Sequence, residues 1–566
     1  MSPNSALCSM LIEHRYLFAC ILVAGFLLAW FAPLCGDFFF SRIERAFANF
    51  AERKALAIFC VVIGAILIRL CFLPILPVPV PEVHDEFSHL LAADTFAHGR
   101  LTNPPHPMAL YFETFHVIQT PTYMSKYPPA DSVLLALGQI VGSPWIGVLV
   151  GMGLMCGSLL WMLQGWFSPK WALVGAVLAF FQIGIWTSWV NTYLGGPTAA
   201  IGGALIMGAA PRIFHRQRFQ DAVVMAIGAG ILANTRPYEG FLLCIPVAVA
   251  LCWFFWRRRA ELPQLGLRIV LPAVCVLVVV AVFMGYYNWR ITGHALTMPY
   301  VLYERTHSST PLFMWQQMRP PLQYANPQFA RLEEVFNVPA YQQRWHNLLH
   351  LTSQREVFAF FFLPALWLPF FVALWWSFVD KRTRLLSGQF VFCVIGAFGP
   401  IWLAAHYAAP LTATTFALMV QGMRHLRRWK FGMRPTGIGL TRLVVLITIG
   451  TSIPNVADVL RTNGSTFAEP QFGLQRASVE HKLEELPGRQ LVVVRYLPGA
   501  GHNIHQDAVS NRTDIDKAKV VWAREIPDVD LQPLLNYFPD RQAWLWQPDL
   551  NPPKLAPYLQ AAEPSK

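Results

Sequence analysis

The chain has 566 residues, of which 55% are hydrophobic, 14% are aromatic and only 13% are charged. Soluble domains carry about 25% charged residues, so this composition excludes a string of soluble globular domains. The sequence predicts an α-helical polytopic membrane protein. The 10 cysteines lie in or beside apolar segments and form no CxxC pair, which argues against a disulfide framework and a zinc knuckle.

Apolar segments of membrane-spanning length recur along most of the chain. A spanning helix needs about 20 apolar residues, and we predict about twelve such helices. They cover residues 16–35, 55–74, 144–164, 171–190, 196–212, 221–235, 240–256, 267–289, 357–379, 385–405, 407–423 and 438–456. The first shows no signal-peptide cleavage site, so we expect it to be retained. The apolar stretch 131–143 is too short to span and predicts an interfacial helix.

The net charge of +12 is explained by membrane topology. Basic residues in short loops mark the cytoplasmic side of a membrane protein. If 36–54 is cytoplasmic, alternation places the other basic loops on that side, while the opposite short segments carry only Arg15 and Arg236. The cytoplasmic set is Arg42, Arg45, Arg53, Lys54, Lys170, Arg212, Arg216, Arg218, Arg257, Arg258, Arg259, Arg268, Lys381, Arg382, Arg384, Arg424, Arg427, Arg428, Lys430 and Arg434. We therefore expect a multi-pass protein of the bacterial inner membrane and no nucleic-acid partner.

Three regions follow from this topology. Residues 1–54 hold the first helix and a cytoplasmic amphipathic segment, and residues 55–456 form a membrane domain with outer loops 75–143 and 290–356. Residues 457–566 are richer in charge and predict a separate extracytoplasmic domain. In it, LVVVRY (491–496), KVVWAR (519–524) and AWLW (543–546) are typical of buried strands, with helical patterns at 474–486 and 528–537. Strands alternating with helices predict a small α/β domain with a partly parallel sheet.

The first outer loop carries adjacent carboxylates, Asp85 and Glu86, just after a membrane helix. A carboxylate at this position can accept the proton of an attacking hydroxyl. Alternatively, Asp85 caps the helix that follows and Glu86 lies in its first turn; the spacing alone favours the cap, and both roles are compatible.

Lys126 precedes the sequence YPPAD farther along this loop, where Pro129 is suited to start a helix. The lysine is either an interfacial side chain that reaches for water or a phosphate contact.

The order of these motifs resembles the GT-C superfamily of integral-membrane glycosyltransferases. A membrane helix is followed by HDE (84–86), a short helix ending in HGRLTNP, and then KYPP (126–129) before an apolar helix. ANTRPYEG (233–240) is similar to the Thr-Arg-Pro turn of the protein mannosyltransferase and aminoarabinose transferase branch, and HYAAP (406–410) to its Arg-Tyr-x-x-Pro. The resemblance, glycosyltransferase family 39-like, covers roughly residues 55–425. His406 stands where that branch has Arg, and the helix at 16–35 and the C-terminal domain have no counterpart in the motif pattern.

The resemblance implies a hexosyl or pentosyl transferase with a polyprenyl-phosphate sugar donor. The acceptor, a glycan, lipid or protein, would be glycosylated at the outer face with inversion at the anomeric carbon. Asp85 would be the general base, with Glu86 the alternative. Cations would stabilise the departing lipid phosphate. The residues expected to bind substrate are His84, Lys126, Tyr127, Arg236, Glu239, Arg290, His406 and Tyr407. The resemblance makes no cofactor certain, and a divalent cation is one option that it allows.

Two other clusters have simpler interpretations. NTYLGGP (191–197) predicts a tight turn, with Tyr193 or Asn191 as a less favoured sugar contact. The tail segment 500–520 contains His502, His505, Asp507, Asp514 and Asp516, for which a solvated loop or a domain-docking surface is favoured over a metal site.

Two rival functions remain at this stage. A transporter or flippase for a lipid-linked or polar solute is the main one, but such proteins often show internal repeats, and none is evident here. An inactive scaffold that binds a lipid carrier is the second.

Overall fold

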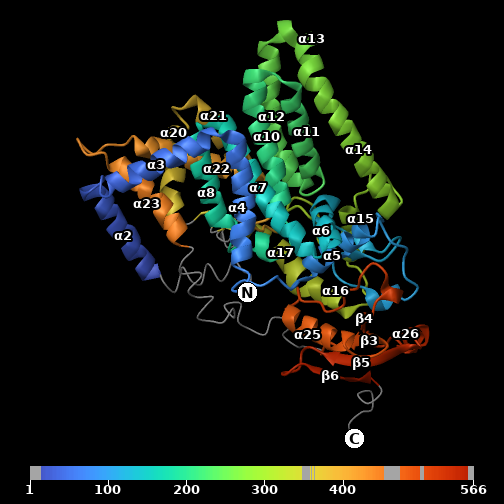
Figure 1. Ribbon diagram of the computed structural model, residues 1–566. Helices are drawn as coiled ribbons and strands as arrows, with labels where there is room; N and C mark the ends of the chain where they lie inside the picture. Colours follow the sequence, from blue (N-terminus) through green and yellow to red (C-terminus); the bar gives the residue numbers. More distant parts are fainter. Residues whose placement is uncertain are drawn as a thin grey trace.

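The computed structural model describes residues 15–346, 357–358, 360–362, 364–451, 472–497 and 503–558. The chain is mainly helical, with a small sheet near its C-terminus (Figure 1). The principal helices are α2 (Arg15–Phe31), α3 (Asp37–Glu52), α4 (Lys54–Cys71), α5 (His84–Ala97), α6 (Pro129–Val141), α7 (Pro144–Trp166), α8 (Pro169–Ile183), α9 (Ser188–Asn191), α10 (Pro197–Arg216), α11 (Phe219–Ala233), α12 (Pro237–Arg257), α13 (Leu262–Leu265), α14 (Leu271–Thr292), α15 (Pro299–His307), α16 (Pro327–Leu332), α17 (Val338–Gln342), α20 (Pro364–Trp376), α21 (Lys381–Ala397), α22 (Thr412–Arg427), α23 (Thr436–Gly450), α25 (Phe472–Glu484) and α26 (Gln532–Tyr537).

Each of the twelve predicted membrane segments contains at least part of a helix, although several helices end inside the predicted range. Among the described residues, four helical stretches are long and apolar enough to cross a membrane: α4, α7, α12 and the continuous run Arg259–Thr292. Six other apolar helices are shorter. Residues 359, 363 and 452–456 of the predicted segments lie outside the described residues, as do the last ten residues of the loop 290–356.

Several predicted boundaries are wrong because glycine and proline end helices earlier than hydrophobicity alone suggests. The segment 171–190 is divided, since α8 ends at Ile183 before Gly184, and the separate helix α9 follows. The segment 385–405 is helical only to Ala397, before the Gly399-Pro400 turn, and α22 starts at Thr412, after Pro410. The interfacial helix predicted at 131–143 is α6.

Close helix packing fixes the position of the first outer loop. α6 begins with Pro129 at its N-terminus and packs against both α5 and α7. A Cβ on Gly147 of α7 would lie 2.0 Å from the carbonyl oxygen of Leu134 in α6, so only glycine permits this approach. α6 is therefore packed closely on α7 and α5.

The C-terminal domain has a four-stranded sheet of order β4-β3-β5-β6. The parallel strands β3 (Arg489–Val494), β4 (Val520–Arg524) and β5 (Arg541–Gln547) confirm the three predicted strands and the partly parallel sheet. The short antiparallel strand β6 (Lys554–Pro557) completes the edge. α25 and α26 occupy the two predicted helical regions.

This domain contacts the first outer loop extensively, and Figure 1 shows its sheet below α5, α6 and α15. Thr513 donates its backbone N–H to Asp94 of α5 at 2.9 Å, and Arg100 pairs with Asp514 at 2.9 Å. The Thr114 hydroxyl donates to Asp507 at 3.0 Å. The domain is thus joined to the loop that carries the predicted catalytic residues.

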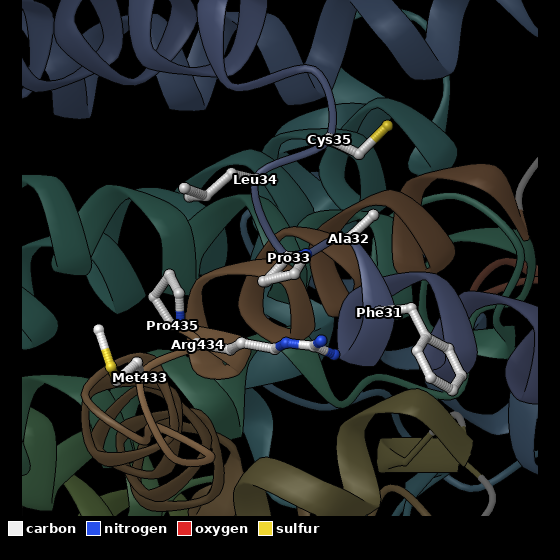
Figure 2. A pocket seen from close by; sticks show the side chains of 8 residues that line it. All are labelled: Phe31, Ala32, Pro33, Leu34, Cys35, Met433, Arg434 and Pro435. Carbon is white, nitrogen blue, oxygen red and sulfur yellow. The ribbon is translucent and has the colours of Figure 1, made fainter.

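A hollow of about 460 Å³ lies between the α2–α3 connection and the α22–α23 connection. Figure 2 shows its lining, in which Arg434 is the one charged side chain among Phe31, Ala32, Pro33, Leu34, Cys35, Met433 and Pro435. None of the predicted site residues lines it.

Candidate active site

The two adjacent carboxylates at the start of α5 have different environments. Glu86 is 1% exposed, and it accepts hydrogen bonds from the backbone N–H groups of Glu82 at 2.8 Å, Val83 at 3.2 Å and Tyr193 at 2.9 Å. The prediction that Asp85 caps this helix is wrong, because Glu86 reaches back to the N-terminal N–H groups instead. The side chain of Asp85 is 30% exposed and remains available to a ligand.

A two-stranded hairpin brings two partners to Asp85. β1 (Val117–Ile118) and β2 (Met124–Ser125) pair antiparallel, so that His116, just before β1, and Tyr127, just after β2, lie at the same end of the hairpin. The Tyr127 hydroxyl donates to Asp85 Oδ1, and His116 Nδ1 lies 3.0 Å from that oxygen and 2.7 Å from the Tyr127 hydroxyl. Ser88 of α5 anchors the hairpin by donating to the His116 carbonyl at 2.7 Å.

His116 was not identified from the sequence. Its backbone φ is +64°, a left-handed conformation that is uncommon for residues other than glycine and is often found at functional sites. A lone histidine in an apolar stretch gives no sign of this geometry. The hydrogen bond from its N–H to the Tyr303 hydroxyl, at 2.8 Å, helps to hold the conformation.

The surroundings of Asp85 favour its ionised form. Burial opposes ionisation, but the imidazole of His116 and the hydrogen bonds from His116 and Tyr127 outweigh it and hold the pKa of Asp85 well below its usual value. The carboxylate is therefore charged at neutral pH and can accept a proton.

His84 is oriented by the C-terminal domain. Its backbone N–H and its ring Nδ1 both face the carbonyl oxygen of His505, at 3.1 and 2.9 Å. A carbonyl only accepts hydrogen bonds, so Nδ1 carries a proton. Burial lowers the pKa of His84, and its Nε2 lies 3.3 Å from Asp85 Oδ2.

Ligand atoms of His84, Asp85 and His116 all lie within 4.8 Å of one another. Two imidazoles and one carboxylate suit Zn²⁺ and related divalent ions. The sequence predicted no metal ligands, because His116 is 31 residues from Asp85 and only the hairpin brings them together.

Lys126 is buried and does not reach for water, in contrast to the simpler of the two predictions. Its side chain is 4% exposed, and its Nζ donates to Glu304 of α15 at 2.9 Å. The rings of Tyr300 and Tyr303 lie 4.4 and 4.5 Å from Nζ. The lysine is therefore a buried, paired cation one residue from Tyr127.

The later motifs form a second cluster near the first. Arg236, at the start of α12, lies over the ring of Tyr407 at 4.4 Å. It interacts electrostatically with Glu239 and Tyr127 as well. The ring of His406 packs edge-on against Tyr407 at 4.7 Å. His406 also interacts with Arg236 and Asp85, so the two clusters share one electrostatic environment.

Arg290 lies apart from this region. It is exposed on α14 and donates to the Tyr286 hydroxyl one turn away at 3.2 Å. The structure therefore brings together the other predicted residues but does not place Arg290 with them.

The polar cluster of the tail is a docking surface, as the sequence favoured. Asp507 forms a buried ion pair with Arg524 at 2.5 Å, and Asp516 pairs with His106 at 3.0 Å. His502 lies outside the described residues. In the predicted turn, Gly195 and Gly196 have φ of +77° and +117°, while Asn191 accepts from Arg69 at 2.9 Å.

Comparisons with known proteins were made by sequence and by structure. No protein-family model matches the chain, and no curated protein matches it in sequence. The structure is similar to that of ArnT from Cupriavidus metallidurans bound to undecaprenyl phosphate, with a TM-score of 0.50 and 12% identity over 87% of this chain and 92% of that one. ArnT in the apo state gives a TM-score of 0.48 and 12% identity, over 88% of this chain and 93% of that one.

The Archaeoglobus fulgidus oligosaccharyltransferase, tethered with an acceptor peptide containing the NVT sequon, is a more distant match. It gives a TM-score of 0.45 and 12% identity over 78% of this chain, which spans 62% of that enzyme's length. The chain therefore has the overall fold of ArnT. This fold agrees with the one expected from the motif resemblance.

Proposed function

We propose that the chain is a membrane glycosyltransferase that transfers a hexose or pentose from a polyprenyl-phosphate donor to an acceptor at the outer face of a bacterial inner membrane. The observation that carries the proposal is the environment of Asp85. This ionised carboxylate is 30% exposed and is held by Tyr127 and His116. The buried cation Lys126 lies beside Tyr127, with its Nζ 5.6 Å from that ring. The ArnT structure contains undecaprenyl phosphate, which supports the same class of donor here.

The proposed reaction is a single displacement with inversion. The acceptor hydroxyl gives its proton to Asp85 as its oxygen attacks the anomeric carbon. The bond between that carbon and the phosphate oxygen breaks on the opposite face, and the lipid phosphate leaves with the electron pair. Negative charge grows on the phosphate, so Lys126 and Arg236 are placed to stabilise it.

Before the donor binds, Lys126 is already paired with the carboxylate of Glu304. Its ion pair with Glu304 must be shared with the phosphate or replaced by it. The three surrounding tyrosines, Tyr127, Tyr300 and Tyr303, keep the ammonium desolvated, and a desolvated cation attracts an anion more strongly than one in water does. We infer that donor binding redirects Lys126 from Glu304 toward the phosphate.

A divalent cation fits the group formed by His84, Asp85 and His116. Such an ion would act as a Lewis acid toward substrate oxygens. The protein residues would hold it through His84 Nε2, whose orientation is set by the His505 carbonyl. Chelation followed by titration with Zn²⁺, Mn²⁺ or Mg²⁺ in isothermal calorimetry tests this binding directly.

The test of the proposed function is a transfer assay with undecaprenyl-phosphate sugars carrying a tritium label in the sugar. Purified protein in mild detergent is incubated with each donor and with cell-envelope acceptor fractions. Label should move from the lipid to the acceptor with wild-type protein, and at least about 100-fold more slowly with Asp85→Asn. Movement of intact labelled lipid across proteoliposome membranes, without transfer, would instead support the transporter alternative.

A further inference from the structure

Asp131, in the first turn of α6, is a buried carboxylate. The residue is 8% exposed, and its Oδ1 is buried with no hydrogen bond among the described residues. Within the same part of the chain, no lysine, arginine or histidine lies within ion-pair distance of it. A buried polar atom without a hydrogen-bond partner is costly unless something satisfies it.

The N-terminus of α6 does not supply the hydrogen-bond donor that Asp131 Oδ1 lacks. Favourable interaction with the helix dipole stabilises the charge as a whole but gives Oδ1 no donor. Neighbouring polar groups are already engaged, since Ser132 Oγ lies 3.3 Å from His89 Nδ1 and Arg236 lies over the Tyr407 ring at 4.4 Å.

The chain keeps space for this carboxylate at the 195–196 turn. A Cβ on Gly195 would lie 2.8 Å from Asp131 Cγ and 2.9 Å from its Oδ1. Gly195 also has a φ of +77°, which disfavours other residues. Tyr193, two residues earlier, donates its N–H to Glu86 at 2.9 Å, so this turn connects Asp131 to the start of α5.

Asp131 belongs to the same region as Asp85. His89 interacts electrostatically with Asp131, Arg236 and Asp85, and its ring stacks on Tyr127 with centroids 4.4 Å apart. Tyr127 in turn bonds Asp85. The backbone N–H of Ala130 donates to the Asn234 carbonyl at 3.0 Å, which fixes the start of α6 beside the turn that carries Arg236.

From this arrangement we infer that Asp131 is a binding residue for the sugar of the donor, accepting hydrogen bonds from its hydroxyl groups. The inference rests on the proposed function and names the part of the donor that this residue recognises. The hydroxyl groups of a sugar donate hydrogen bonds, and a carboxylate oxygen without a partner accepts them without a proton transfer. Asp85 acts on the acceptor, the cations act on the phosphate, and Asp131 distinguishes a donor that carries a sugar from bare lipid phosphate.

The test compares two ligands on the same protein sample. Binding of undecaprenyl phosphate and of undecaprenyl phosphate carrying glucose, galactose, mannose or arabinose is measured by native mass spectrometry in mild detergent. The sugar that the wild type binds most tightly is then used for the variants. Asp131→Asn preserves shape while removing the charge. Asp221→Asn is the matched control, because Asp221 also lies in the first turn of a membrane-domain helix and has a buried oxygen without a partner in the described structure.

Asp131→Asn should weaken binding of the sugar-bearing lipid by about 10- to 100-fold, the loss expected for hydrogen bonds to a charged group. Its affinity for bare undecaprenyl phosphate should stay within about twofold, which also shows that the variant is folded. Equal weakening of both ligands, or no weakening of either, overturns the inference, as does a wild type that gains no affinity from any sugar. If neither ligand binds to the wild type at all, the proposed function itself fails.

Discussion

The buried ion pair between Lys126 and Glu304 gives a quantitative test of the geometry around the candidate site. The two side chains are 4% and 9% exposed, and Nζ and Oε1 are 2.9 Å apart. Removing one partner of such a pair leaves an uncompensated buried charge and costs about 3–5 kcal/mol, whereas replacing both by apolar residues is often nearly neutral. We therefore expect Lys126→Met and Glu304→Leu each to lose about 3–5 kcal/mol of stability, and the double variant to recover most of it.

The free energy of unfolding can be compared by titrating sodium dodecyl sulfate into mixed micelles and following tryptophan fluorescence. A double-mutant cycle then isolates the coupling between the two side chains. Losses below about 1 kcal/mol in both single variants, the range of exposed pairs, would refute the burial and pairing described here. So would a double variant whose loss equals the sum of the single losses.

Three further predictions concern neighbouring features. Asp85 acts as a base only when ionised, so activity is lost as the pH falls through its depressed pKa. His116→Phe should raise that pKa and move the acidic limb of the profile of kcat/KM against pH to higher pH. An unmoved limb would contradict the role of His116. Gly195→Ala combines a strained φ with contact at 2.8 Å to a buried carboxylate and should cost about 1–3 kcal/mol, seen as a lower thermal midpoint; an unchanged midpoint would count against the close approach. Asp507→Asn leaves Arg524, which is 1% exposed, without its charge partner and should lower the free energy of unfolding by about 3–5 kcal/mol. Asp540→Asn, which breaks the exposed pair of Asp540 with Arg489, is the control and should cost less than about 1 kcal/mol.

The helices of the membrane domain could be predicted because each depends on local hydrophobicity. Their ends were less predictable, since Gly184 and Pro410 interrupt helices inside apolar runs. The strand β6 was not predicted because prolines surround it. It follows Asn551-Pro552-Pro553 and ends at Pro557, and a proline-rich sequence does not indicate a strand, since proline is tolerated only at a sheet edge.

The candidate site was only partly predictable for a different reason. Asp85, Lys126 and Tyr127 lie in motifs that can be read along the chain, but their partners are distant in sequence. Glu304 is 178 residues from Lys126, and the His505 carbonyl is 421 residues from His84. No spacing rule links such residues, since the hairpin, α15 and the C-terminal domain must all be in place first.

The role of Glu86 shows why adjacent carboxylates could not be distinguished from sequence alone. Which of the two reaches back to the helix N-terminus depends on the turn that precedes α5 and on the Tyr193 N–H. Both depend on tertiary contacts rather than on the letters HDE.

The most direct test of the central claim is native mass spectrometry of the wild type and Asp85→Asn, purified in mild detergent from the same host, with analysis of the co-purified lipids. Loss of the base blocks transfer but leaves the donor contacts intact. We therefore predict undecaprenyl phosphate bound to the wild type and a sugar-bearing undecaprenyl phosphate accumulating on Asp85→Asn. If both proteins carry only bulk phospholipid, or the same undecaprenyl species in the same proportion, Asp85 is not the base of a lipid-phosphate-dependent glycosyl transfer.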